Sequence, residues 1–169
     1  MQRLQRWALL GLLAFGTAGK IDRLEDAERT HFLALRVFMT EKDQKAFLKL
    51  KTPALRDQWL KDHGLWARFY QYDARRREEI SAGHVATGWL QDQVFMAWGP
   101  PYQRQKSLDA SLSGRVEVLT YRFEVSEDGE ILVWAEGSKE THHAQDRFRQ
   151  RLTLQNGAVL RMERLEGWD

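Results

Sequence analysis

The sequence predicts an α+β fold in which N-terminal helices are followed by a helix–turn hinge and an antiparallel meander of three or four strands. Two observations support this prediction. Between residues 20 and 80, apolar side chains recur every three or four positions, which is the period of a helix. Beyond residue 115 they alternate with polar side chains, which is the period of a strand. Such a sheet buries one face, so we expect the helices to pack on that face.

The composition is that of a globular protein. Of 169 residues, 43 % are hydrophobic and 30 % are charged. The sequence contains no cysteine, which excludes a disulfide framework, a thiolate metal site, a cysteine nucleophile and the residue that carries the lipid of a bacterial lipoprotein. It also contains no run of 18 or more apolar residues, so we expect no permanent transmembrane span.

Residues 1–19 have the order of a secretory signal peptide. Arg3 and Arg6 precede an apolar run from Trp7 to Phe15, and small residues follow. The alternative is an N-terminal apolar helix, because the run is short and lacks a clear cleavage site. Cleavage would remove two arginines from a formal charge of +2 and leave a neutral chain, which does not favour nucleic acid. We expect export to the periplasm or outer membrane, with the cytoplasm as the alternative.

Residues 20–80 are predicted to form a series of short helices. The first apolar face consists of Leu24, Ala27, His31, Leu35 and Phe38. Helix starts are indicated by the capping residues Thr40 and Asp43 and by Thr52-Pro53, and Gly64 indicates a stop. We interpret His31 and His63 as core or boundary residues. We interpret Arg75–Arg77 as a solvated helix face, because acidic residues follow at once.

The hinge segment, residues 88–101, is predicted to be a helix between glycine and proline signals. Gly88 permits a positive φ, Asp92 lies near the positive helix end, Gly99 suits a left-handed cap, and Pro101 prevents continuation. Apolar residues occur on one face (Leu90, Val94, Ala97, Trp98) and beyond it (Trp89, Phe95, Met96). We therefore expect a helix buried between the sheet and the N-terminal helices. In the alternative, Trp89, Phe95 and Met96 form an exposed patch for a partner.

This segment resembles two known families. Gly88, Val94, Gly99 and Pro101 match the pattern of BamE-like (SmpA/OmlA) envelope proteins, and Gly88–Asp92 resembles the motif of the GWxTD domain, with Gln91 in place of threonine. Weaker echoes are Phe47–Thr52, Arg56, Trp59, Trp66 and Trp98–Pro101. The resemblance covers roughly residues 45–165 and implies two helices followed by a three-stranded antiparallel sheet. It also implies binding or scaffolding in the envelope, without known catalysis.

The strands are predicted after a polar loop, Tyr102–Gly114. The first covers 118–125, the second covers 130–135 after a turn, and the third covers 147–154. Asn156-Gly157 is a strong hairpin signal, so the last strand is expected at 158–165. We expect 81–169 to form one compact unit with the helical region 20–80.

Two polar groups are candidate ligand sites. His142 and His143 lie close to Asp146, but adjacent histidines do not readily face one ion, so we interpret them as part of a polar loop and expect no metal and no cofactor. Arg147, Arg149 and Arg151 alternate along one strand and could contact phosphates or anionic lipid headgroups. The other interpretation of this row is a solvated face that pairs with Glu124 or Glu163.

The sequence therefore favours a non-enzymatic adaptor or accessory subunit with protein partners in the cell envelope. The motif residues are Gly88, Trp89, Asp92, Val94, Trp98, Gly99 and Pro101, and the candidate interaction residues are Phe95, Met96, Arg147, Arg149 and Arg151. The alternatives are a small hydrolase whose site assembles only in three dimensions, and an inhibitor or ligand-binding domain that uses the sheet face. A deep pocket that unites two or more of Glu79, His84, His142 and Asp146 would favour the hydrolase.

Overall fold

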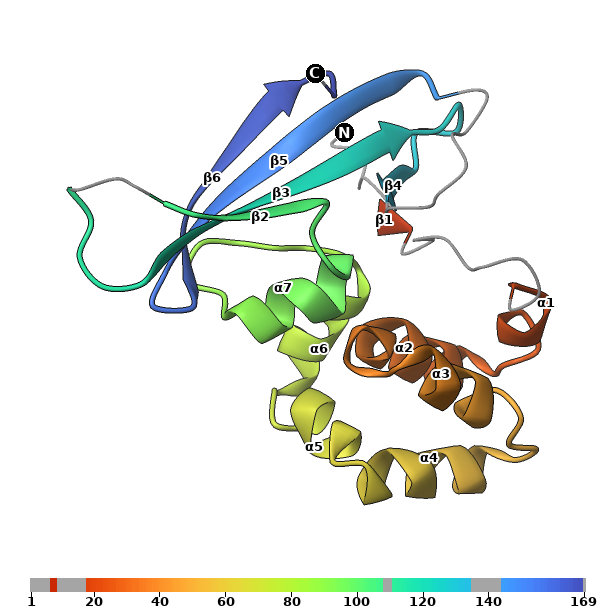
Figure 1. Cartoon of the computed structure of the whole chain (residues 1–169). Coiled ribbons are helices and arrows are strands. Elements are labelled where there is room, and N and C mark those ends of the chain that lie inside the picture. Colours follow the sequence, from red (N-terminus) through yellow and green to blue (C-terminus); the bar gives the residue numbers. More distant parts are fainter. Residues whose placement is uncertain (1–6, 9–17, 108–110, 135–143, 169) are drawn as a thin grey trace.

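The computed structural model describes residues 7–8, 18–107, 111–134 and 144–168. Helices precede an antiparallel sheet in the chain, so the predicted α+β class is confirmed (Figure 1). The helices lie on one side of the sheet, and its opposite face carries none of them. No helix in these ranges has the length and apolar character needed to cross a bilayer.

The helical part is a chain of short elements joined by tight turns. Its members are α1 (Ala18–Ile21), α2 (Asp26–Leu35), the 3₁₀ helix η1 (Arg36–Phe38), α3 (Glu41–Phe47), α4 (Pro53–Asp62), α5 (Leu65–Tyr70), α6 (Ala74–Ser81) and α7 (Gln91–Trp98). The first predicted helix was expected to reach Phe38 as one element. It changes to 3₁₀ geometry at Arg36 instead.

Capping side chains determine several of these boundaries. The Thr40 hydroxyl accepts a hydrogen bond from the Asp43 amide, while the Asp43 carboxylate accepts from the Thr40 amide, so the predicted capping box is confirmed. Thr52 accepts from the Leu55 amide at the start of α4, with Pro53 in the first turn. Such caps satisfy amides that have no partner within the helix.

The sheet contains β1 (Trp7–Ala8), β2 (Gln103–Lys106), β3 (Val116–Val125), β4 (Ile131–Trp134), β5 (Asp146–Gln155) and β6 (Ala158–Glu166). The strand order is β1-β4-β3-β5-β6, and β2 also pairs with β3. Two details differ from prediction. β2 occupies part of the expected polar loop, and β5 pairs with β3 and not with β4, so the order is not that of a simple meander.

The length of β3 explains both differences. β3 and β5 pair over ten residues each, whereas β4 covers only the Arg122–Val125 end of the other edge of β3. Residues Glu117–Thr120 of that edge pair with β2. The hairpin between β5 and β6 is confirmed, with positive φ at Asn156 (50°) and Gly157 (82°).

Helix α7 joins the helical part to the sheet. The ring of Trp98 meets Tyr121 edge-on at 5.1 Å and Phe123 at 5.0 Å. Phe148, stacked on Phe123 at 5.0 Å, is fully buried as well. The face that carries these rings is the inner face of the sheet. Since α2 also contacts α7, helices and sheet share one hydrophobic core.

Of residues 1–19, the structure describes only Trp7–Ala8 and Ala18–Gly19, and the latter two begin α1. Trp7–Ala8 forms β1, which runs parallel to β4, and is not helical. The rest of residues 1–17 lies outside the described residues, as do His142 and His143.

Candidate functional site

The hinge segment continues the edge of the sheet. The Gly88 amide donates to the Val159 carbonyl at 2.7 Å, and the Val159 amide donates to the Trp89 carbonyl at 2.8 Å. Gly88 has a φ of +82°, as the sequence predicts. Residues 88–90 thus pair with the first two residues of β6 before the chain turns into α7.

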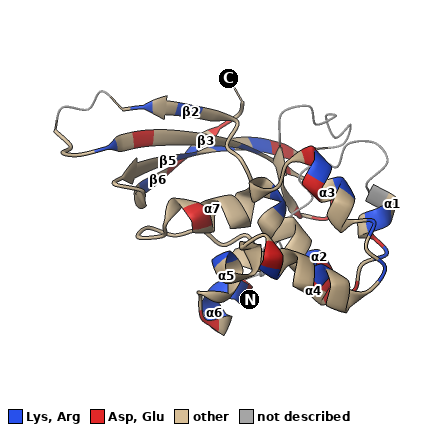
Figure 2. Cartoon of the chain, turned by 60° about the horizontal axis from the view of Figure 1, so that its bottom comes forward, with Lys and Arg blue, Asp and Glu red and all other residues tan. Residues whose placement is uncertain are grey.

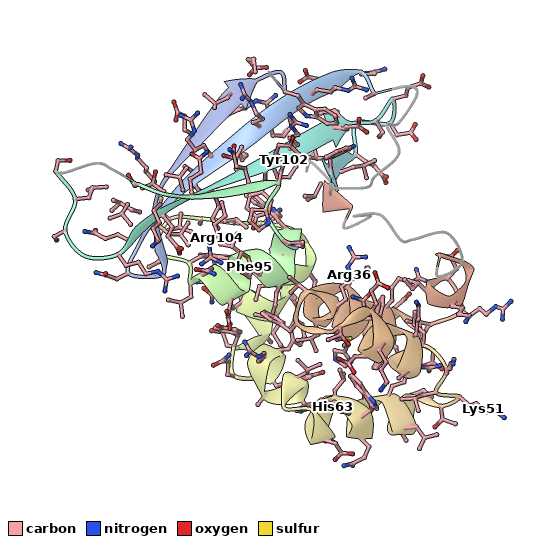
Figure 3. The ribbon with its side chains drawn as sticks, viewed as in Figure 1. Arg36, Lys51, His63, Phe95, Tyr102 and Arg104 are labelled. Carbon is pink, nitrogen blue, oxygen red and sulfur yellow. The ribbon has the colours of Figure 1, made fainter. Side chains whose placement is uncertain are left out.

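Most apolar residues of the hinge segment are buried and are therefore not available to a partner. Trp89 is 4 % exposed, and Met96 is fully buried, as are Val94 and Ala97. Met96 therefore offers no surface to a partner, contrary to its selection as a candidate interaction residue. Phe95 is partly buried against the same core, and Figure 3 labels it on α7.

Leu90, in contrast, is more exposed than the sequence predicted. It was expected on the buried face of the helix, but it is the N-cap residue of α7 and is 50 % exposed. The amide of Leu90 donates a hydrogen bond to the side-chain oxygen of Gln93 at 2.7 Å. The extended backbone of an N-cap residue turns its side chain away from the helical face.

The closing residues of the segment connect the helix to its neighbours. Gly99 has φ +77° and ψ −162°, a positive φ but not the left-handed cap expected, and its carbonyl accepts a hydrogen bond from the Tyr121 hydroxyl at 3.0 Å. Trp98 donates to the Gly83 carbonyl at 2.7 Å. Asp92 lies in the first turn of α7 and pairs with Arg68 at 2.7 Å. Burial raises the pKa of Tyr121 well above its usual value.

A cavity of about 480 Å³ lies beside the hinge segment. It is lined by Arg76, Glu79, His84, Ala86, Thr87, Gly88 and Trp89. It thus unites Glu79 and His84, two residues of the pocket expected for a hydrolase, but its lining residues from 86 to 88 and His84 are exposed, so the cavity is open and not deep. The Glu79 carboxylate pairs with Arg75 at 3.2 Å and with Arg76 at 3.3 Å.

Asp146 lies elsewhere and is also engaged. Its carboxylate pairs with Arg164 at 3.2 Å and accepts from the Arg147 amide at 2.8 Å. Among the described residues, no group of three or more histidine, aspartate or glutamate side chains could hold a metal ion.

The outer face of the sheet, which is turned away from the helices, carries a cluster of rings and guanidinium groups. We call Tyr102, Arg122, Trp134, Arg147 and Trp168 the outer-face cluster. Arg122 alternates with the inner residues of β3 and pairs directly with Trp134 of β4. Figure 3 labels Tyr102, which immediately precedes β2.

Arg122 lies at the centre of this cluster. Its guanidinium carbon is 3.8 Å from the ring centroid of Tyr102, 5.3 Å from that of Trp168 and 5.7 Å from that of Trp134. It also donates to the Trp168 carbonyl at 3.1 Å, while the Trp168 indole donates to the Phe123 carbonyl at 3.1 Å. The hydrogen bond to the Phe123 carbonyl thus fixes the Trp168 ring, and a cation–π contact with this ring helps to fix the Arg122 guanidinium.

The arginine row of β5 continues this surface. Arg147 pairs with Glu124 at 3.4 Å and lies 4.8 Å from the Trp168 ring, and Arg151 pairs with Glu163 at 3.3 Å. The predicted pairing with Glu124 and Glu163 is confirmed. Arg149 stands directly opposite Arg122 on the neighbouring strand.

Positive charge exceeds negative charge on this face. By strand register, the described outer face carries Arg122, Arg147, Arg149, Arg151 and Arg161 against Glu124 and Glu163. Both glutamates already pair with an arginine of the same face. Basic positions, shown blue in Figure 2, occur along the strands as well as on the helices.

The sequence identified only part of the outer-face cluster. Arg147 was named, and the alternation of β3 placed Arg122 opposite the core residues, which is the signal that could have found it. Tyr102 was assigned to a loop, and Trp168 follows the last predicted strand. Only the folded sheet brings these two rings to one arginine.

Comparison of the chain with protein-family models, with curated proteins and with solved structures finds no match. The resemblance of the hinge segment to GWxTD and BamE-like proteins therefore stays a prediction from the sequence.

Proposed function

We propose that this protein is a non-enzymatic adaptor or accessory subunit of the bacterial cell envelope, which binds a protein partner through the outer face of its sheet. The outer-face cluster carries this proposal. Tryptophan, tyrosine and arginine are the residue types in which binding hot spots are enriched. Here they gather on a face that no described helix covers, and Tyr102 is 39 % exposed.

The burial of the hinge segment supports the same choice. Trp89 and Met96 were the alternative partner contacts, and both are buried. The hinge segment therefore packs between the helices and the sheet and offers little surface to a partner. The outer face, with its tryptophan, tyrosine and arginine side chains, has the composition typical of an interface. The envelope location is supported by the signal-like order of residues 1–19 and by the resemblance of Gly88–Pro101 to envelope families.

Site-specific crosslinking tests the binding surface. A photoreactive residue at Gln103, which lies opposite Thr120 on the outer face, is compared with one at Leu55, which is 51 % exposed on α4. We expect one stoichiometric envelope protein to crosslink at Gln103 and not at Leu55, and its purified form to bind the wild-type chain. Equal crosslinking at both positions, or none at Gln103, would reject the outer face as the binding surface.

The location is tested on the native protein. Mass spectrometry of the N-terminus should find a chain shortened by about 18 residues in the periplasmic or outer-membrane fraction. An intact Met1 in a cytosolic fraction would contradict the envelope assignment while leaving the binding surface open to the first test.

A small hydrolase is the second candidate, because the cavity beside α6 brings Glu79 and His84 together, although it is open and not deep. The Glu79 carboxylate is already engaged in ion pairs with Arg75 and Arg76. The exposed imidazole of His84 is therefore the group to test. Purified protein and a His84→Ala variant are compared for hydrolysis of p-nitrophenyl acetate. Loss of hydrolysis in the variant supports the enzyme, and equal background rates exclude this site.

A further inference from the structure

Three helices bring a carboxylate, an imidazole and a phenol hydroxyl together in the helical part. Asp57 belongs to α4, His31 to α2 and Tyr70 to α5, and α5 contacts both of the other helices. The Tyr70 hydroxyl lies 2.7 Å from Nε2 of His31, and a carboxylate oxygen of Asp57 lies 3.8 Å from Nδ1 of the same ring. A hydroxyl within hydrogen-bond reach of a base, with a third group beside the base, is the arrangement typical of an activated nucleophile.

Burial keeps His31 neutral and holds its ring in place. The side chain is 9 % exposed and lies edge-on against the ring of Trp66 at 5.3 Å. Burial is the largest influence on the pKa of His31 and lowers it below the ordinary 6.5, so the ring is neutral near pH 7. The negative charge of Asp57 on the Nδ1 side favours the tautomer that carries its proton there. Nε2 then accepts the hydrogen bond of the Tyr70 hydroxyl.

Tyr70 is the member of this group that reaches solvent. It is 37 % exposed, whereas His31 is buried. Burial raises the pKa of Tyr70, so the hydroxyl is protonated at neutral pH and needs a base to react. The guanidinium carbon of Arg77 lies 4.7 Å from the centroid of the Tyr70 ring, and its charge favours the phenolate that forms when the proton leaves. Trp66 stacks on the Tyr70 ring at 4.2 Å and limits its movement.

We propose that Tyr70 is a modification site, at which an activated acyl donor transfers its acyl group to the phenol hydroxyl. The Tyr70 oxygen forms a bond to the acyl carbon, the bond between this carbon and the leaving group breaks, and Nε2 of His31 takes the hydroxyl proton. The leaving group departs with the bonding electrons and then receives this proton through solvent. Asp57 acts through His31 and is a positioning residue.

This site is separate from the surface assigned to the partner. The helix that carries Tyr70, α5, lies among the helices on one side of the sheet, and the outer face is the opposite side (Figure 1). The modification therefore goes beyond the proposed adaptor role and does not depend on it.

The test measures acetylation of the purified full chain by N-acetylimidazole, which transfers its acetyl group to tyrosine hydroxyls. Mass spectrometry of the peptides gives the rates at Tyr70 and at Tyr102 in the same molecule. Tyr102 is a matched internal control, because it is 39 % exposed and the guanidinium carbon of Arg122 lies 3.8 Å from its ring centroid. Among the described residues, no histidine bonds to the Tyr102 hydroxyl. The two tyrosines thus differ mainly in the base.

We expect Tyr70 to react at least about tenfold faster than Tyr102, since a positioned base contributes about 10²–10⁴-fold. His31→Gln should lower the rate at Tyr70 about tenfold or more and leave the rate at Tyr102 unchanged. Equal rates at the two tyrosines in the wild-type chain would overturn the proposal. An unchanged rate at Tyr70 in a folded His31→Gln variant would also overturn it, because the hydrogen bond would then be structural only.

The pH profile tests the same step without a variant. The charged groups that face His31 are Glu28 of its own helix, Asp57 of α4 and Arg77 of α6. Because the base must be neutral, the rate at Tyr70 should be nearly level between about pH 7 and about pH 8 and should fall in acid. A tyrosine without a base reacts as its phenolate, so a rate that rises about tenfold per pH unit at Tyr70 would contradict the proposal.

A variant of Asp57 tests the positioning role and replaces His31→Gln if that variant does not fold. Asp57 raises the pKa of His31, so Asp57→Asn should move the acid fall of the Tyr70 rate to lower pH. Asp62→Asn removes the same charge from an exposed position of α4 and should leave the profile unchanged. The same profile in wild type and Asp57→Asn would reject the role of Asp57. Since none of these measurements involves the outer face, the crosslinking test at Gln103 decides the adaptor separately.

Discussion

The indole of Trp98 meets the ring of Tyr121 edge-on at 5.1 Å, and this contact joins the helix of the hinge segment to the central strand of the sheet. The backbone completes the joint on both sides. Trp98 donates to the Gly83 carbonyl, and Tyr121 donates to the Gly99 carbonyl. One pair of rings thus connects α7, β3 and the turn that follows α6, so a substitution at this position should affect the stability of the whole core.

Trp98→Ala should lower the free energy of unfolding by about 3–5 kcal/mol, because it removes a buried ring and leaves the Gly83 carbonyl without its donor. Urea denaturation followed by circular dichroism measures the loss. The control is Leu55→Ala, at a side chain 51 % exposed, which should change stability by about 0.5 kcal/mol or less. An unchanged melting temperature together with loss of the partner would instead make the hinge segment a binding site.

Gly99→Ala should destabilise the fold by about 1–3 kcal/mol, since φ +77° with ψ −162° is a conformation that only glycine adopts readily. The cost is backbone strain alone, because a Cβ at this position meets nothing within 4 Å. Gly19→Ala is the matched control. Its Cβ also meets nothing within 4 Å, its φ is not positive, and it lies in α1, where alanine is favoured. A loss as large in Gly19→Ala would refute the strain argument.

Arg56→Met should cost about 3–5 kcal/mol, because it leaves the carboxylate of Glu28 buried without its counter-ion. The side chains of this pair are only 11 % and 6 % exposed. Arg68→Met provides the comparison, since Arg68 pairs with Asp92 and both are nearly half exposed, so about 0–1 kcal/mol is expected. Equal losses in thermal unfolding would show that burial does not separate the two pairs.

His31 should make the protein less stable in mild acid. Burial lowers the pKa of His31 below its ordinary 6.5, although Asp57 and Glu28 raise it in part and Arg77 lowers it further. The unfolded chain then binds a proton that the folded chain does not, so the free energy of unfolding falls as pH decreases below 6.5 and levels off below the folded pKa.

His31→Gln removes the titrating group and should flatten this part of the pH profile, as measured by urea unfolding at several pH values. Tyr70→Phe is the control. It removes the hydroxyl that lies 2.7 Å from His31 Nε2 but leaves the imidazole in place, so the fall in acid should persist. The same slope in wild type and His31→Gln would assign the effect to another group.

Much of the helical half followed from short-range pattern. The caps at Thr40 and Thr52 bond to amides three residues further along the chain, so they can be recognised from a few adjacent residues. The hairpin at Asn156-Gly157 is equally local. In contrast, periodicity placed Leu90 on the buried face and did not detect that it would become an N-cap.

Pairing between distant segments could not be obtained in this way. Alternation identifies a strand and its faces but not its neighbour, so the pairing of β5 with β3, and of β2 with β3, is visible only in the sheet. The candidate surface depends on the same pairing. Arg147 was named from β5 alone, whereas Arg122 receives its rings from Tyr102, Trp134 and Trp168, which belong to three other segments of the chain.

Local pattern was sufficient for the α+β class, for most helix starts and for the glycine–proline frame of the hinge segment, because caps, turns and amphipathic periods act over a few residues. Tertiary contacts decided the meaning of that segment and the place of the candidate site. Met96 became core because helix and sheet close over it, and Arg122 became the centre of a cluster because three strands and the segment after β6 meet there. Burial and cross-strand neighbours are properties of the folded chain as a whole.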